Sequence, residues 1–414
     1  MTKEKFYIQQ FDNGLTLLAE QLDYVVSAAV VLAVPAGCSR DTAGLSGAST
    51  VMTEWLFRGA GGRNSRQLND ALDNLGCHRE ETVRSLFVHF QASQTHQSLN
   101  EVLALYADVV ARPELDDSTF DPCRNLVFQE LSGLEDDPAR KCNLCLREQF
   151  YPKPLGSPVL GTAESLKAMT SKSLRAHARR VMSPGGSMLA VAGRFDWPAL
   201  RDHVEGLFGT WRGQPAGELS LSPPPRGVVQ EKKETSQVQI CLAYDAPLPQ
   251  EEKLYYPMRV AEMVLSGGMS SRLFTEVREK RGLVYSVGAR YHGMKAAAGM
   301  FIYAGTAPER AQQTLDVTVA ELKRLEQGID PDELVRAKTQ LKSALVMQGE
   351  STGARANGLV GDWHLLARLR GLEEISAAID AVTRQDVLDC LEAYPARHMT
   401  GCFLGPQALD TACL

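Results

Sequence analysis

Short apolar runs alternate with longer amphipathic segments, and the same order occurs once in each half of the chain. In each half, two runs rich in Val, Ile, Leu and aromatic residues predict buried strands. Each run is followed by a segment in which apolar residues recur every three or four positions, as on one face of a helix. The predicted strands cover 25–32, 86–92, 238–244 and 300–305, and the predicted helices include 99–106, 254–265 and 311–322.

A second long helix is predicted in each half by a polar start. Asp116-Asp117-Ser118 and Asp330-Pro331 carry the acidic and proline residues that suit a first helical turn. Asp12-Asn13-Gly14 predicts a hairpin near the N-terminus. These patterns predict an α+β fold with two homologous α/β-roll domains, each a sheet with helices packed on one face. A repeat of roughly 210 residues is a domain duplication and not a solenoid unit.

A proline-rich stretch near the midpoint separates the two halves. It contains Pro215 and the run Pro223-Pro224-Pro225, a composition typical of linkers. We therefore expect an N-terminal domain over residues 1–212, a linker over 213–229 and a C-terminal domain over 230–414.

The composition limits the classes of binding partner and the cellular compartment that we expect for this chain. Of 414 residues, 44% are hydrophobic and 23% are charged, and the net charge of −6 argues against nucleic-acid or anionic-membrane partners. The charged start Met1–Tyr7 does not resemble a signal peptide. The longest apolar stretch, 25–34, is too short to span a bilayer. Nine cysteines, an odd number, do not predict a disulfide framework, so we expect a reducing cytoplasm.

Cysteine and histidine spacing gives little sign of a metal site. Cys142 and Cys145 form a C-x-x-C motif in a segment predicted to be helical. Because no second pair accompanies them, two half-buried thiols are favoured over a redox or metal function. None of the eight histidines are three or four positions apart, so no helical metal-binding pair is predicted.

The segment 44–59 resembles the active-site helix of the pitrilysin/insulinase-type zinc peptidases. That family carries the inverted motif H-x-x-E-H before a Phe-Lys/Arg-Gly triplet, and Phe57-Arg58-Gly59 matches the triplet. The resemblance places Thr50, Thr53 and Glu54 where His, Glu and His would stand. A threonine hydroxyl is a poor zinc ligand, and Thr53 cannot serve as a general base near neutral pH.

Further positions of the same resemblance are only partly kept. Glu130, 76 positions after Glu54, has the separation of the family's third zinc ligand, while Cys123 replaces a second acidic position. The stretch 76–82 has Arg-Glu where the family has Asn-Ala beside the cleft. We therefore expect this chain to bind no metal. The alternative is a weak hard-cation site built from Glu54, Glu130 and Cys123 or His78.

The segment 267–286 resembles the C-terminal signature of the same family. Arg278 and Tyr285 stand where the family's Arg and Tyr contact the substrate backbone and the reacting carbonyl, with Phe274 and Gly282 in the expected frame. Arginine offers planar charged donors for carbonyls or a carboxylate, and a tyrosine hydroxyl can hydrogen-bond a developing oxyanion. The alternative is a pair making local hydrogen bonds between a helix and a strand.

In some branches of this family, such as the mitochondrial processing peptidases, two similar chains divide the work. One chain holds the zinc and the other presents the Arg/Tyr pair. The resemblance implies that this chain is the catalytically inactive subunit of a heterodimeric zinc endopeptidase. Arg278 and Tyr285 would bind an unfolded peptide, and the zinc would lie in a homologous partner, so the chain would not be an enzyme on its own.

Two other functions remain open from the sequence. The chain could be a peptide-binding or structural scaffold without a protease partner, although a scaffold has no evident need of the Arg/Tyr pair. It could also be a stand-alone hydrolase with unusual ligands, which the missing base at Thr53 disfavours.

Overall fold

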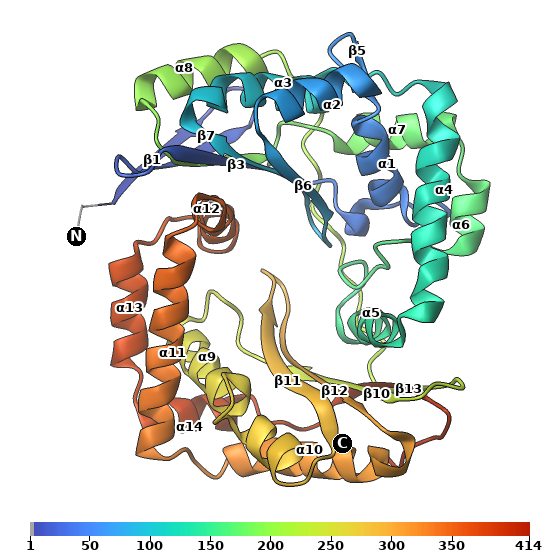
Figure 1. The fold of residues 1–414 in the computed structure, drawn as a ribbon, viewed down its shortest axis with the longest axis vertical. Helices are drawn as coiled ribbons and strands as arrows, with labels where there is room; N and C mark the ends of the chain where they lie inside the picture. Colours follow the sequence, from blue (N-terminus) through green and yellow to red (C-terminus); the bar gives the residue numbers. More distant parts are fainter. Residues whose placement is uncertain (1–3) are drawn as a thin grey trace. The chain divides into compact units, whose positions relative to one another are not determined.

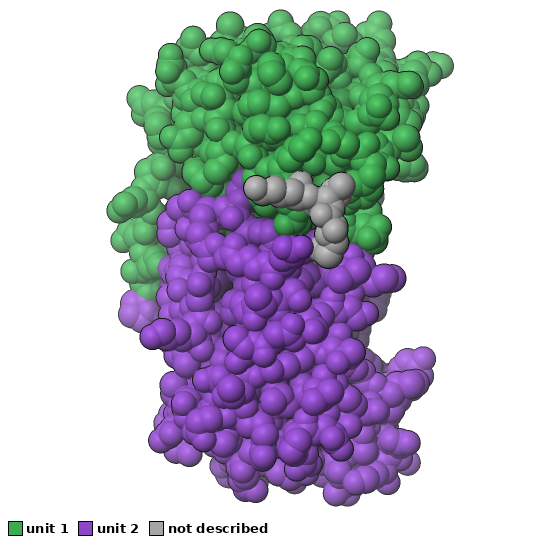
Figure 2. Space-filling view, turned by 90° about the vertical axis from the view of Figure 1, so that its left-hand side faces the viewer, with its two compact units in different colours: residues 1–133, 153–222, 348–363 green, residues 134–152, 223–347, 364–414 purple. Residues whose placement is uncertain are grey.

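A computed structural model describes residues 4–414, so the first residues of the charged stretch Met1–Tyr7 lie outside the described part. The chain forms two compact units (Figure 2). Unit 1 comprises Met1–Gly133, Lys153–Ser222 and Gln348–Trp363. Unit 2 comprises Leu134–Pro152, Pro223–Met347 and His364–Leu414. Among residues 4–414, no helix is both long and apolar enough to cross a bilayer.

Unit 1 is built on a six-stranded sheet with the order β1-β2-β8-β3-β7-β6. Only the β2–β8 pairing is parallel, and the other neighbours are antiparallel. The strands are β1 (Lys5–Gln10), β2 (Thr16–Gln21), β3 (Ser27–Val34), β6 (His78–Val83), β7 (Val88–Thr95) and β8 (Met188–Gly193). The central strand β3 is buried along nearly its whole length, which requires cover on both faces of the sheet.

That cover comes from both halves of the sequence. Helices α2, α3 and α8 lie over one face of the sheet, and α12 lies on the other (Figure 1). The sequence predicted helices packed on one face of each sheet. In unit 1, α12 covers the other face as well. The helices are α1 (Ala48–Leu56), α2 (Ser65–Asn74), α3 (Leu99–Ala111), α4 (Asp117–Gly133), α6 (Ala163–Ala168), α7 (Ser171–Val181), α8 (Trp197–Phe208) and α12 (Thr352–Leu366). A short hairpin follows α1, with β4 (Gly59–Ala60) and β5 (Arg63–Asn64).

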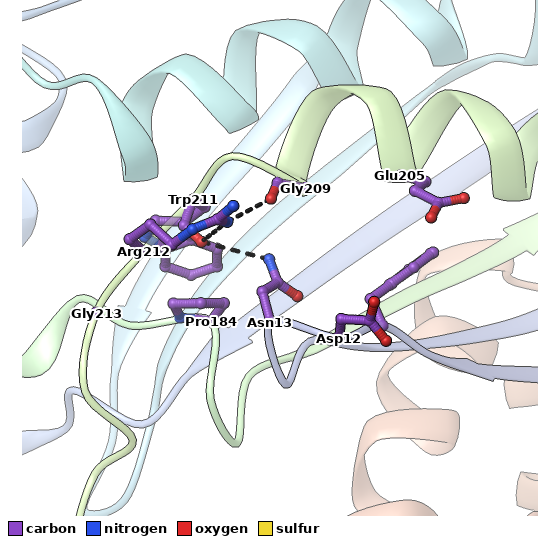
Figure 3. Close-up of a pocket in the computed structure, with 9 residues that line it drawn as sticks. Asp12, Asn13, Pro184, Glu205, Gly209, Trp211, Arg212 and Gly213 are labelled. Atoms are coloured by element: carbon purple, nitrogen blue, oxygen red, sulfur yellow. Dashed lines mark hydrogen bonds between the residues drawn. The ribbon is translucent and has the colours of Figure 1, made fainter.

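The predicted hairpin joins β1 to β2. Gly14 adopts a φ of +91° at the turn, a conformation that glycine reaches without strain. The Asn13 amide donates to the carbonyl of Phe208 at 2.8 Å and to that of Trp211 at 3.4 Å. Figure 3 shows this side chain in a hollow that Arg212 also lines. The turn is thus tied to the end of α8, more than 190 residues away in sequence.

Unit 2 repeats the plan with a five-stranded sheet in the order β11-β12-β10-β13-β9. Its strands are β9 (Val228–Lys232), β10 (Val238–Asp245), β11 (Val284–Gly293), β12 (Ala298–Thr306) and β13 (Thr400–Gly405). Its helices are α5 (Pro138–Phe150), α9 (Glu252–Ser266), α10 (Ala311–Leu325), α11 (Pro331–Gly349), α13 (Leu372–Ala381) and α14 (Arg384–Ala393). Helix α5 packs against β10 and β13.

Two helices therefore belong to the unit formed mainly by the other half of the chain. Helix α5 precedes the proline-rich stretch yet lies in unit 2. Helix α12 follows that stretch, yet most of it lies in unit 1. The chain passes from unit 1 to unit 2 within the proline-rich stretch, between Ser222 and Pro223. Each sheet thereby receives one helix that its own half of the sequence does not supply.

Candidate functional site

Helix α1 carries the positions that correspond to the zinc motif, and Asp41 fixes where this helix begins. The Asp41 carboxylate accepts hydrogen bonds from Gly47 N at 2.8 Å, Ser49 N at 3.0 Å and Ser49 Oγ at 2.6 Å. Burial raises the pKa of Asp41 to about 6, against the lowering effect of these hydrogen bonds. A carboxylate at a helix N-terminus satisfies amide groups that the helix itself leaves unpaired. Asp41 thus stabilises the N-terminus of α1 independently of the residues at the zinc-motif positions.

The hydroxyls at the first two motif positions are engaged with the backbone. Thr50 Oγ1 donates to the carbonyl of Val159 at 2.6 Å, and Thr53 Oγ1 donates to the carbonyl of Ser49 at 2.8 Å. Thr53 is only 6% exposed. Both side chains act as neutral donors inside unit 1, so neither provides a charged ligand or a base.

The third motif position pairs with the arginine of the Phe-Arg-Gly triplet. Glu54 Oε2 lies 3.6 Å from Arg58 Nη2. Arg58 Nε also donates to the buried thiol of Cys123 at 3.3 Å. Burial raises the pKa of Cys123 and Arg58 opposes that rise. Glu130 lies two turns further along the same helix, α4, with an exposed side chain.

These residues do not fit a catalytic zinc ion. Zinc requires about three ionised or imidazole ligands around one open position, and positions 50 and 53 supply neutral donors turned toward carbonyls. Within the described range 4–414, no three His, Cys, Asp or Glu side chains are grouped as metal ligands. The alternative cation site from Glu54, Glu130, Cys123 and His78 therefore has no supporting geometry.

Strand β6, which carries His78, forms an open edge of the unit 1 sheet. It pairs with β7 on one side, and no strand among residues 4–414 pairs with its other side. Arg79 stacks over the Phe57 ring at 4.7 Å and binds Glu81 at 3.0 Å. Burial raises the pKa of Glu81, Arg79 lowers it, and neighbouring Glu54 raises it further. The stretch that departs from the family pattern thus brings a paired charge cluster to an edge strand able to accept another strand.

Arg278 and Tyr285 lie together in unit 2. Arg278 belongs to the π-helix η4 (Phe274–Glu279), and its guanidinium lies between the rings of Phe274 at 5.0 Å and Tyr285 at 5.1 Å. Stacking of this kind orients an arginine while leaving its N–H groups available. Neither side chain has a hydrogen-bond or ion-pair partner among residues 4–414, so the local hydrogen bonds of the alternative interpretation are not formed.

A β-bulge presents Tyr285 to solvent. Strand β11 pairs with β12 through Val284 and Thr306 and then through Ser286 and Gly305, which leaves Tyr285 as the extra residue. A bulge re-aims a side chain in this way. Tyr285 is 81% exposed, and β11 is itself an edge strand. The sequence showed the spacing of the pair but carried no signal for the bulge.

The sequence interpretation missed two contacts that hold these sites. Asp41 was not singled out, because it lies six positions before the N-cap Gly47 and a capping signal is expected at the N-cap itself. The Arg58–Cys123 contact links the triplet to the position of a lost acidic residue. No periodicity signals it, because the two residues are 65 positions apart.

Comparison with known proteins identifies the family. A model described as insulinase (peptidase family M16) matches residues 16–163, and one described as the peptidase M16 inactive domain matches residues 168–341. A protein of Bacillus subtilis named as an uncharacterized zinc protease is 30% identical over 383 residues, covering 91% of this chain and 92% of the relative. One from Rickettsia felis is 26% identical over 417 residues, covering 98% and 99%. The chain belongs to peptidase family M16, the pitrilysin/insulinase family.

Solved structures show the same fold. The peptidase M16 inactive domain from Pseudomonas fluorescens has a TM-score of 0.89 at 19% identity, covering 98% of this chain and 99% of that one. A protease from Helicobacter pylori has a TM-score of 0.88 at 17% identity, covering 98% and 100%. The predicted α+β fold with two domains is confirmed.

Proposed function

We propose that this chain is the catalytically inactive subunit of a heterodimeric zinc endopeptidase. Its Arg278 and Tyr285 bind peptide substrate, and a homologous partner chain supplies the zinc. The observation that carries the proposal is the pairing of an exposed tyrosine with a stacked arginine whose donors have no partner within the described chain. Surface side chains of this kind contribute little to folding, so both remain available to bind a ligand from outside the chain.

Each side chain has a distinct task in this proposal. The Arg278 guanidinium donates to a carbonyl or terminal carboxylate of the peptide and fixes its register. The Tyr285 hydroxyl donates to the reacting carbonyl as negative charge develops on its oxygen. The metal-activated water belongs to the partner, because the positions of Thr50, Thr53 and Glu54 supply no zinc ligands or base here.

The first test is the composition and activity of the native complex. The tagged chain is purified from its own organism and analysed by native mass spectrometry. A second chain of similar size with one bound zinc supports the proposal. A metal-free monomer or homodimer contradicts it.

Substitutions in that complex then test the Arg/Tyr pair. Tyr285→Phe should lower kcat about 100-fold, since removal of one oxyanion donor costs about that much. Arg278→Ala should lower kcat/KM about 10- to 100-fold, the loss of one charge-assisted hydrogen bond. Matched controls are Tyr24→Phe and Arg66→Ala, exposed residues of unit 1. Normal cleavage by both test variants in an intact complex would refute the assigned roles.

A peptide-binding protein without a protease partner is the second candidate. The open edge of β6 favours it, because an extended peptide can add to such a strand without any metal. In that case the isolated chain binds unfolded peptide and no zinc-bearing chain co-purifies with it.

A further inference from the structure

Four cysteines that are far apart in sequence converge on one face of the unit 2 sheet. Cys142 and Cys145 lie one turn apart on α5, the helix that packs on β10 and β13. Cys241 of β10 and Cys402 of β13 are directly paired across the two strands. Paired residues of neighbouring strands point to the same face. The C-x-x-C motif therefore lies beside two further cysteines, although the four do not form a metal-binding group within residues 4–414.

Within this cluster the Cys142 thiol contacts that of Cys241, and the sulfur atoms of Cys145 and Cys402 are also in direct contact. Cys145 Sγ lies 2.8 Å from Cys402 Sγ. The Cys142 thiol is also directed at the carbonyls of Cys402, at 3.0 Å, and Gln239, at 3.8 Å. A disulfide needs a separation of about 2.05 Å, so Cys145 and Cys402 can bond after a movement of under about 1 Å.

The two thiols of this pair differ in access and acidity. Cys145 is partly exposed, whereas Cys402 is buried. The hydrogen bond from the Cys402 thiol lowers the pKa of Cys145, which burial and the nearby Glu148 and Glu231 oppose. The same contact raises the pKa of Cys402. The thiolate is the reactive form of cysteine. Because Cys145 is the more exposed and the more acidic thiol of the pair, we expect it to react first with an oxidant.

We propose that Cys145 and Cys402 form a reversible disulfide when the protein meets a hydroperoxide. The Cys145 thiolate attacks one oxygen of hydrogen peroxide and the O–O bond breaks. Hydroxide is the leaving group, and Cys145 becomes a sulfenic acid. The Cys402 sulfur then attacks the sulfenic sulfur, the S–S bond forms, and water departs with the thiol proton. A dithiol returns both sulfurs to thiols by exchange.

This bond would tie α5 to β13 across 257 positions of sequence. Helix α5 comes from the first half of the chain and β13 is the last strand. Oxidation would therefore link α5 covalently to the sheet of unit 2. None of the four cysteines belongs to the zinc-motif positions or to the Arg/Tyr pair.

Thiol counting and peptide mapping test the proposal on the full chain. Reduced protein is treated with one to ten equivalents of hydrogen peroxide, denatured, and alkylated. Alkylatable thiols should fall from nine to seven, the mass should drop by about 2 Da before alkylation, and one cross-linked peptide should join Cys145 to Cys402. Dithiothreitol should restore all nine.

Cysteine variants provide the controls. Cys145→Ser should lose no thiols under the same treatment, while Cys413→Ser, at a partly exposed thiol outside the cluster, should still lose two. Mapping the unsubstituted protein keeps the test valid if a variant folds poorly. The proposal fails if all nine thiols survive ten equivalents, if the lost thiols map elsewhere, or if the four cysteines take up one added zinc ion that blocks oxidation.

Discussion

Replacing Arg355 by alanine should destabilise unit 1 strongly at neutral pH and only weakly in mild acid. Arg355 lies on α12 and forms an ion pair with Glu20 of β2. Its side chain is 10% exposed and that of Glu20 is 3% exposed. Glu4 lies 3.5 Å from the same guanidinium. The pair thus connects a helix from the second half of the chain to a sheet formed by the first.

The size of the effect follows from what Glu20 does once its partner is gone. Removing one member of a buried pair typically costs about 3–5 kcal/mol. Glu20 can limit that penalty by taking up a proton. At pH 7, protonating a carboxyl whose usual pKa is 4.5 costs about 3.4 kcal/mol. We therefore expect Arg355→Ala to lower the free energy of unfolding by about 3 kcal/mol.

The pH dependence carries a definite sign. Burial already raises the folded-state pKa of Glu20, and Arg355 opposes that rise. Losing the arginine raises this pKa further, so the folded variant binds a proton more readily than the unfolded chain does. Stability from such a group is present at low pH and is lost as pH rises through the folded pKa. At pH 5 the cost of protonation falls to about 0.7 kcal/mol, and the variant should approach the parent protein.

Tryptophan fluorescence during urea unfolding at pH 7 and pH 5 measures this effect in unit 1 alone. All four tryptophans lie in unit 1: Trp55, Trp197, Trp211 and Trp363. The double variant Arg355→Met/Glu20→Met should recover most of the loss, since it leaves no buried charge unpaired. A loss below 1 kcal/mol at pH 7, or a loss that grows toward pH 5, would refute the reasoning.

Three further predictions concern folding. Asp41→Ala should lower the stability of unit 1 by about 2 kcal/mol in the same fluorescence assay, because α1 loses its cap, whereas Asp41→Asn retains an acceptor and should lose less. Thr53→Glu should destabilise by at least about 2 kcal/mol by burying a carboxylate, while Thr53→Ser, which keeps the bond to Ser49, should cost under about 1 kcal/mol. The Cys145–Cys402 disulfide should stabilise unit 2 by up to about 5 kcal/mol, measured by far-ultraviolet circular dichroism with and without reductant.

Local hydrophobic patterns predicted four strands and three helices of the fold. The four predicted strands correspond to β3, β7, β10 and β12, and the helical stripes correspond to α3, α9 and α10. The polar starts at Asp117 and Pro331 match the first residues of α4 and α11. These elements were predictable because burial of one face imposes its period on the sequence.

The exchange of α5 and α12 between units was not predictable in this way. A helical period shows that a helix buries one face but not which sheet receives it. The ion pair of Arg355 with Glu20 spans 335 positions, and the contact of Cys145 with Cys402 spans 257. Both contacts depend on the complete topology, and so do the bulge at Tyr285 and the carbonyl partners of Thr50 and Thr53.

The two sets of family positions differ in how much folding depends on them. Thr50 and Thr53 donate to backbone carbonyls inside unit 1, so replacing them disturbs a helix as well as any site. Among residues 4–414, the side chains of Arg278 and Tyr285 make only ring-stacking contacts, with each other and with Phe274. Substitutions at such surface positions usually change stability by under about 0.5 kcal/mol. A loss of peptide cleavage in Tyr285→Phe can therefore be assigned to substrate binding or chemistry. A failure after restoring the zinc motif would instead remain mixed with damage to α1, so the Arg/Tyr pair gives the more decisive test of function.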